Sequence, residues 1–410
     1  MANVQTSAFR LLTTAANLTR YNALGDVQFT VVATESQTQI THRIGGTLSL
    51  LLVDVDSNAN TGTTTIKTRI NGADGNQVVS YASGETGEKE DAVNTDTVVA
   101  GDELNYQLVT GATGGNFISR FASTVFSATS NTGKRLGTSR FNASNASTSH
   151  YSPIEGWTNT STTEADMQYQ FKTAGTLKNM CGNMANNTRT TTTTYHSRIN
   201  GANGNLTVAY GSGVTGLQED TVNSDTIAVD DLVCWTADTG TGTGNIEGLM
   251  FADFETTNSK FIGGATFSGA ASTIGTSLTR WSHPFARGES GTAISSEGQA
   301  QLDMQFAQTI SEMQSYVSSN GITANTTLRY RVNGADGNML ITYASGETGR
   351  KNDSVNTETI VADDETNFVF TTGGTGTTIL FRVWGTMHET SPVTAASITF
   401  FPRRLMMGVS

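Results

Sequence analysis

Cysteine and proline are both scarce in this sequence. The 410 residues include two cysteines, Cys181 and Cys234, and four prolines. Two cysteines exclude a disulfide framework and cannot form a thiolate metal site by themselves, so we interpret them as buried thiols. Four prolines exclude proline-rich linkers, and neighbouring domains are therefore expected to abut closely.

Charge is also sparse. Charged residues make up 15% of the chain, the net charge is −12 and the pI is about 4.9, with no run of lysine or arginine. A phosphate backbone requires such a basic surface, so nucleic acid is not an expected partner. No apolar run is long enough to span a bilayer, and the first residues lack the pattern of a secretory signal. We expect a soluble chain that is made in the cytoplasm and does not insert into membranes.

Small polar residues are abundant instead. The chain has 43 glycines, many threonines, serines and asparagines, and 36% apolar residues. This balance is typical of short strands joined by tight turns. At about 150 residues per domain, the length predicts roughly three domains.

A domain-sized repeat is the strongest signal. The stretch RINGADGNQVVSYASGETG begins at Arg69, RINGANGNLTVAYGSGVTG at Arg198 and RVNGADGNMLITYASGETG at Arg331, so the copies are 129 and 133 residues apart. This is the spacing of whole domains and not of a short solenoid repeat. The segments TRYN at Thr19, SRFN at Ser139 and TRWS at Thr279 are interpreted as the starts of the copies. The predicted domains are 1–135, 136–270 and 271–410.

Each copy carries the same turn signatures. Asn-Gly pairs tolerate positive φ and predict a tight hairpin turn at Asn71-Gly72, Asn200-Gly201 and Asn333-Gly334. An aspartate also recurs at one position of each copy, as Asp91, Asp220 and Asp353. Because an aspartate side chain accepts nearby backbone N–H groups, we interpret these three as residues that fix a turn and not as catalytic acids.

The strand pattern decides the fold class. Apolar residues alternate around the first Asn-Gly turn, at Ile66, Ile70, Val79 and Tyr81, which is typical of half-buried strands. Around eight such strands per copy predict an all-β chain of three tandem antiparallel β-sandwiches of the jelly-roll type. An immunoglobulin-like sandwich is the alternative, although its Cys…Trp…Cys spacing is absent.

The repeated motif also carries a family resemblance. The pattern R-[I/V]-N-G-A-[D/N]-G-N, followed by G-x-T-G and D-x-V-N, resembles bacteriophage structural proteins with TNF/C1q-like jelly-roll domains, of the capsid-decoration or fibre-knob type. The resemblance covers the central part of each copy, under half of the chain. It implies a trimer-forming sandwich displayed on a virion, without catalytic activity.

The resemblance gives the expected location and partners. We expect a protein of the virion surface, synthesised in the host cytoplasm, that serves as a capsid decoration or a short spike. Its partners would be other virion proteins, of the capsid or the tail, and itself in a trimeric or pseudo-trimeric arrangement. The three copies either close into a pseudo-threefold unit or stack in line, and the sequence leaves both open. The alternative function is a receptor-binding tail fibre or adhesin that recognises host surface glycans.

Few residues point to chemistry. Asp54, Asp56, Asn58 and Asn60 offer oxygen atoms at alternate positions, as calcium loops do, but the glycine and glutamate of a complete loop are missing. The five histidines lack a metal-ligand spacing, and no nucleophile elbow or complete phosphate loop occurs. We therefore expect neither an enzyme nor a cofactor, and a polysaccharide-degrading enzyme is the third and least favoured function.

Overall fold

The computed structural model describes residues 3–6, 12–13, 16–25, 32–129, 132–144, 146–157, 160–256, 258–266, 273–285 and 294–390. The regular structure of these residues consists of β-strands and short 3-10 turns. No helix among them is long and apolar enough to cross a membrane. The predicted all-β class is confirmed.

The first sandwich, called lobe 1, has two antiparallel sheets. One sheet has the order β1 (Asn3–Thr6), β10 (Gly114–Ala128), β5 (Gly46–Asn60) and β8 (Gly87–Val98), and β2 (Leu12–Thr13) also pairs with β10. The other has the order β3 (Thr19–Ala23), β9 (Glu103–Val109), β6 (Thr64–Ile70) and β7 (Ala73–Tyr81), and β4 (Ile40–Thr41) also pairs with β9.

Lobe 2 repeats this arrangement. Its first sheet has the order β13 (Gly156–Trp157), β11 (Thr132–Ala143), β20 (Ile246–Thr256), β15 (Gly175–Asn187) and β18 (Gly216–Ile227). Its second sheet has the order β12 (Ser149–Pro153), β19 (Leu232–Thr239), β16 (Thr193–Ile199) and β17 (Ala202–Tyr210), with β14 (Tyr169–Gln170) also on β19.

Lobe 3 repeats it again. Its first sheet has the order β21 (Lys260–Thr266), β31 (Gly376–Glu389), β25 (Gln308–Ile322) and β28 (Gly349–Asp353), with β22 (Thr273–Gly275) on β31 and β29 (Glu358–Ile360) on β25. Its second sheet has the order β23 (Thr279–Ser282), β30 (Asp364–Thr371), β26 (Thr326–Val332) and β27 (Ala335–Tyr343), with β24 (Leu302–Met304) on β30.

The strand order identifies the fold. When the eight main strands of a lobe are counted along the chain, one sheet reads first, eighth, third, sixth and the other reads second, seventh, fourth, fifth. All three lobes share this order, which is that of a jelly roll and differs from the seven-strand immunoglobulin arrangement. The predicted jelly-roll sandwiches are therefore confirmed.

Strand pairing corrects both predicted boundaries and one predicted start. Strand β11 pairs with β20, so residues 132–135 belong to lobe 2, although the predicted boundary at 135 placed them in the first domain. Strand β21 pairs with β31, so residues 260–266 belong to lobe 3, although the predicted boundary at 270 placed them in the second domain. The SRFN segment at Ser139 lies on β11, whereas TRYN and TRWS lie on β3 and β23. The true counterpart in lobe 2 is the segment that begins at Ser149, on β12. The letters SRFN at Ser139 match TRYN more closely than SHYS at Ser149 does, although only Ser149 lies on the equivalent strand.

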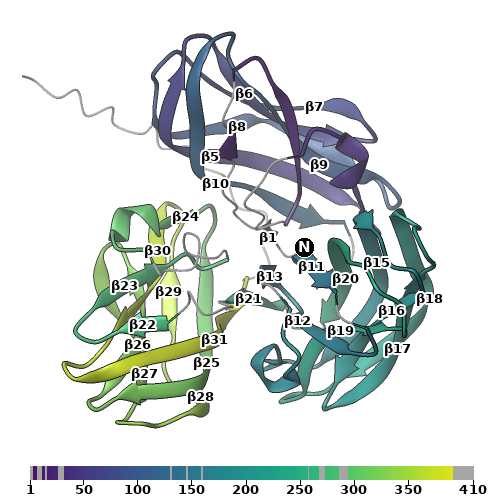
Figure 1. Cartoon of the computed structure of the whole chain (residues 1–410). Coiled ribbons are helices and arrows are strands. Elements are labelled where there is room, and N and C mark those ends of the chain that lie inside the picture. The colour runs from purple at the N-terminus through teal and green to yellow at the C-terminus, as the bar shows by residue number, and fades with distance from the viewer. Residues whose placement is uncertain are drawn as a thin grey trace, which may run out of the picture.

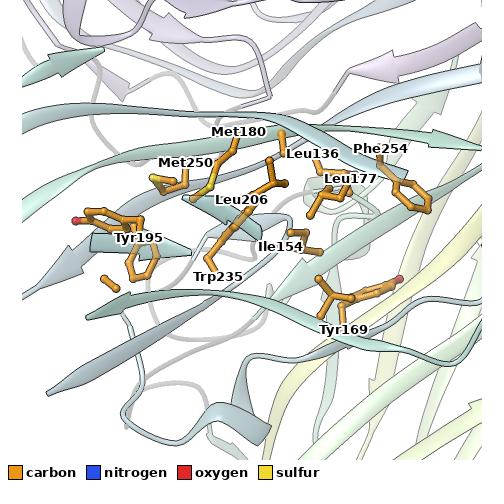
Figure 2. Close-up of a cluster of buried hydrophobic side chains, with 14 of the residues drawn as sticks. Leu136, Ile154, Tyr169, Leu177, Met180, Tyr195, Leu206, Trp235, Met250 and Phe254 are labelled. Carbon is orange, nitrogen blue, oxygen red and sulfur yellow. The ribbon is translucent and has the colours of Figure 1, made fainter. Parts of the chain in front are cut away.

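Each lobe has a hydrophobic core between its two sheets. In β7, the buried residues Gln77, Val79 and Tyr81 alternate with exposed ones, because successive side chains of a strand point to opposite faces. In lobe 2, Trp235 lies among aromatic and sulfur-containing side chains (Figure 2). Cys234 on the same strand is buried and free, as is Cys181, in agreement with the interpretation from the sequence.

The three lobes lie around a common centre, with lobe 3 returning to lobe 1 (Figure 1). Their first strands, β1, β11 and β21, lie near the middle of this arrangement. Hydrogen bonds join lobe 1 to lobe 2, lobe 2 to lobe 3 and lobe 3 to lobe 1. Of the two arrangements that the sequence left open, the structure has the closed, pseudo-threefold one.

Candidate functional site at the junctions between the lobes

The repeated Asn-Gly pairs lie at the turn between the fourth and fifth strands of each lobe. Each asparagine and glycine has a positive φ, between 48° and 83° in the six residues. The side chain of Asn71 closes the turn, since its Nδ2 donates to Asp102 at 2.7 Å and its Oδ1 accepts the N–H of Glu103 at 2.9 Å. The same bonds recur around Asn200 and Asn333. Positive φ explains why asparagine and glycine occupy these positions.

Asp91, Asp220 and Asp353 each hold a loop of the sixth strand. Asp220 accepts the backbone N–H groups of Thr207, Val222 and Asn223 at 3.0 to 3.2 Å. Burial by itself would raise the pKa of Asp220, but the hydrogen bonds from Asn223 and from these N–H groups outweigh it and hold the pKa below its usual value. The other two aspartates have the same partners and the same lowered pKa. Their geometry is that of a turn-fixing residue.

The four residues considered for calcium make two kinds of contact: the aspartates bind an arginine, and the asparagines hydrogen-bond to nearby backbone and side-chain groups. Arg120 donates to Asp54 at 2.7 Å and to Asp56 at 3.1 Å. Asn58 donates to the carbonyl oxygens of residues 82 and 85, and its Oδ1 accepts the N–H of Asn60. No group of three acidic, histidine or cysteine residues suited to a metal occurs within the described part of the chain. The guanidinium therefore bridges the two carboxylates and balances one of their two negative charges.

A short segment of each lobe reaches the next lobe. We call it the docking segment; it comprises residues 35–43, 164–172 and 297–305 and begins with the 3-10 turns η1 (Glu35–Gln37), η2 (Glu164–Asp166) and η4 (Glu297–Gln299). Its first residue is a glutamate that pairs with the arginine at the head of the repeated motif. The pairs are Glu35 with Arg69 at 2.8 Å, Glu164 with Arg198 at 3.1 Å and Glu297 with Arg331 at 2.6 Å. The motif arginine thus anchors the docking segment to its own lobe.

The docking segment of lobe 1 contacts strands β15 and β18 of lobe 2. Asn183 on β15 donates from Nδ2 to the carbonyl oxygens of Ser36 and Gln39, each at 2.8 Å. Arg43 forms an ion pair with Glu219 on β18. Ile40 lies in one apolar cluster with lobe 2 residues that include Cys181 and Phe251. Polar and apolar contacts together fix this junction.

The docking segment of lobe 2 contacts lobe 3 in the same way. Gln314 on β25 donates to the carbonyl oxygen of Gln170 at 2.6 Å and accepts its N–H at 3.0 Å. Arg350 on β28 donates to the carbonyl oxygen of Gln168 at 2.9 Å. Arg382 pairs with Asp166 at 3.2 Å.

The docking segment of lobe 3 closes the ring on lobe 1. Gln5 on β1 donates to the carbonyl oxygen of Asp303 at 2.9 Å, and its Oε1 accepts the N–H of Gln305 at 3.3 Å. Gln305 donates in turn to Glu90 on β8 at 3.2 Å. Phe121 of lobe 1 joins the apolar cluster of lobe 3. Each junction is therefore a head-to-tail contact, and three of them close a ring.

The junctions are equivalent in position but not in residue. The repeat spacing places Arg43 and Glu219 of the first junction at the positions of Gln305 and Glu90 in the third. An ion pair at one junction is thus a neutral-to-charged hydrogen bond at another. The three junctions therefore join their lobes through different combinations of charged and neutral side chains.

A buried ion pair lies near the centre of the ring. Val4, Lys134 and Phe261 occupy the same register in the first strand of each lobe, opposite Phe126, Phe254 and His388. Lys134 pairs with Glu155 at 2.5 Å and also donates to the carbonyl oxygen of Ile262 in lobe 3. Burial lowers the pKa of Lys134 and raises that of Glu155. Burial of these two charged groups is tolerated because the ammonium and the carboxylate form an ion pair with each other.

The docking segments and the anchoring function of the motif arginines were not predicted from the sequence. Arg69, Arg198 and Arg331 were visible as the first residue of the motif, but their glutamate partners lie 34 residues upstream, as the pairing of Arg69 with Glu35 shows. A glutamate recurring at that fixed interval before each motif was the available signal.

No family model matches this chain, and no curated protein matches it. Among solved structures, one of Sulfolobus turreted icosahedral virus is similar over 84% of this chain and 80% of its own, at 14% identity and a TM-score of 0.22. A second, described by the triple jelly roll fold and turret assembly in an archaeal virus, covers 94% of this chain and 91% of its own, at 15% identity and a TM-score of 0.20. With TM-scores this low, the fold assignment rests on the strand order given above.

Proposed function

We propose that this chain is a structural component of a virus particle. The observation that carries the proposal is the closed ring of three jelly-roll lobes within one polypeptide. The jelly roll is a recurrent unit of viral shells, and it manages sheet edges by packing two sheets together. The resemblance of the repeated motif to bacteriophage jelly-roll proteins supports the same function.

Within this function, the proposed role is a surface decoration or short spike of a phage-type virion, made in the host cytoplasm. Its partners are capsid or tail proteins and neighbouring copies of the chain. No catalytic activity is proposed. The ring supplies the pseudo-trimer inside a single chain, so a further trimer of chains is not needed to create threefold contacts.

One exposed side chain recurs on all three lobes and suits such assembly. Val93, Val222 and Val355 are 86%, 91% and 86% exposed, and each lies in the loop held by the repeated aspartate. The preceding position differs between the copies, as the half-buried Ala92 and the exposed Thr221 and Ser354. The adjacent strands β8, β18 and β28 end their sheets, and sheet edges are natural places for contact between chains.

The test is cryo-electron microscopy of purified particles together with protein mass spectrometry. We expect the chain at symmetry-related sites of the shell in stoichiometric amounts. The triple substitution Val93→Asp, Val222→Asp and Val355→Asp should reduce incorporation, and the isosteric threonine triple serves as the control. Absence of the chain from purified particles contradicts the proposal, and a few copies at a tail or vertex favour the receptor-binding alternative.

A further inference from the structure

A groove lies at the junction between lobes 1 and 2. It consists of two adjoining hollows of about 350 Å³ and about 230 Å³, which share Gln37 and Ala185 in their lining. The larger hollow lies between the docking segment of lobe 1 and the start of β18 in lobe 2, at residues 215–217. Its volume reaches the lower end of the range, roughly 300–1,000 Å³, that is usual for small-molecule sites.

The pseudo-symmetry of the ring shows why this junction is open. The repeat spacing places Asn183 and Leu217 of the larger hollow at the positions of Tyr316 and Arg350 in lobe 3. There, Arg350 lies over the ring of Tyr316 at 5.5 Å and reaches the carbonyl oxygen of Gln168 in lobe 2. The two large side chains thus occupy, at the second junction, the space that the smaller pair leaves free at the first.

The smaller hollow follows the same rule. Leu249 lines it, and the strand register gives Val383 as its counterpart in lobe 3. The neighbouring Arg382 lies at an irregularity of β31 for which lobe 2 has no residue, and it crosses the junction to Asp166. Two smaller side chains and the lack of this arginine on one face of lobe 2 therefore convert a filled junction into a groove.

The lining has the chemistry of a site for neutral hydroxyl groups. In the larger hollow it includes Thr34, Ser36, Gln39, Asn183 and Thr215. Asn183 is 2% exposed, and its amide donates both protons to lobe 1 carbonyl oxygens while its Oδ1 has no partner in the structure. A buried acceptor without a partner costs free energy that a ligand hydroxyl recovers.

The charge of the lining narrows the ligand class. Each hollow has one charged side chain, Glu103 in the larger and Glu247 in the smaller, and neither lining includes a lysine or arginine. Two carboxylates in a chain of net charge −12 disfavour anionic ligands. Met184 and Leu217 add an apolar surface for C–H groups.

We propose that this groove binds a neutral saccharide, with the Oδ1 of Asn183 accepting a hydroxyl and the hydroxyl and amide groups of lobe 1 bonding others. The inference rests on the groove alone and stands whether or not the chain is a virion component.

The experiment uses the full chain and a panel of neutral sugars: glucose, galactose, mannose, N-acetylglucosamine, N-acetylgalactosamine and their disaccharides. Saturation-transfer NMR identifies binders, and calorimetry measures their Kd. The double substitution Asn183→Tyr and Leu217→Arg installs the residues that lobe 3 carries at these positions. We expect saturable binding to at least one sugar and at least tenfold weaker binding by the double variant.

A matched variant provides the control. Tyr316→Asn with Arg350→Leu makes the reverse exchange at the second junction and should leave the first groove and its affinity unchanged. If the double variant in lobe 2 does not fold, Leu217→Arg alone serves in its place. Absence of saturable binding to every sugar of the panel overturns the proposal, as does unchanged affinity in the folded filled variant. Particle incorporation of the filled variant tests the virion role separately.

Discussion

Substitution of Asp220 by alanine tests whether the repeated aspartates fix the loops of the sixth strand. The change removes the acceptor of three backbone N–H groups, those of Thr207, Val222 and Asn223. At about 1 kcal/mol for each N–H, the free energy of unfolding should fall by about 3 kcal/mol at pH 7. Because Asp91 and Asp353 make the same bonds, their alanine variants should lose the same amount, and losses in different lobes should add.

The pH dependence gives a second measurement on the same residue. The folded-state pKa of Asp220 is depressed, so the unfolded state binds the proton more readily. The stabilisation is therefore fully present above the unfolded pKa, about 4, and is lost as the pH falls through the folded pKa. Urea unfolding followed by tryptophan fluorescence should show a penalty for Asp220→Asn that is larger at pH 7 than at pH 2.5. An equal penalty at both pH values, or an alanine penalty under about 1 kcal/mol at pH 7, refutes the reasoning.

Three further outcomes are expected. Glu155→Ala should lower the free energy of unfolding by about 3–5 kcal/mol, because it leaves Lys134 buried without its partner. The double substitution Lys134→Met with Glu155→Leu should lower it much less in a double-mutant cycle measured by urea unfolding, and equal losses contradict this. His283 is buried and its pKa is lowered to about 3, so the unfolded state gains a proton first as the pH falls from about 6.5. The free energy of unfolding should therefore decline by up to about 1.4 kcal/mol per pH unit in an acid titration. His283→Phe should reduce this slope. Burial raises the pKa of Cys181 to about 11 and that of Cys234 well above its usual value, so neither thiol should react with a disulfide reagent at pH 8 until urea unfolds the chain; rapid reaction of the folded protein contradicts their burial.

The fold could be predicted because its sequence patterns are local and occur in all three copies. The alternation of buried and exposed side chains along β7, and the positive φ at Asn71 and Gly72, depend on a few adjacent residues, and the same patterns recur in the other two lobes. The boundary of the third lobe was misplaced because β21 pairs with β31, more than 100 residues away, and no local sequence pattern indicates this pairing.

The junctions could not be predicted for a related physical reason. A hydrogen bond from Asn183 to the carbonyl oxygens of Ser36 and Gln39 depends on which lobes meet, and closed and in-line arrangements use the same lobe sequences. The repeat spacing alone relates Asn183 to Tyr316. That both residues face a junction between lobes, and that the first junction is hollow, is visible only in the structure.

Joining three lobes in one polypeptide changes what dilution and mutation can do to the ring. In a trimer of separate subunits, each contact weakens as the protein is diluted, and every substitution appears at all three contacts at once. Here the lobes are tethered, so each contact forms at an effective concentration that is independent of the amount of protein. A single substitution, such as the one that distinguishes Leu217 from Arg350, alters one contact and leaves the other two as they were. The fused chain can therefore specialise one joint of its ring while two unchanged joints continue to hold it closed.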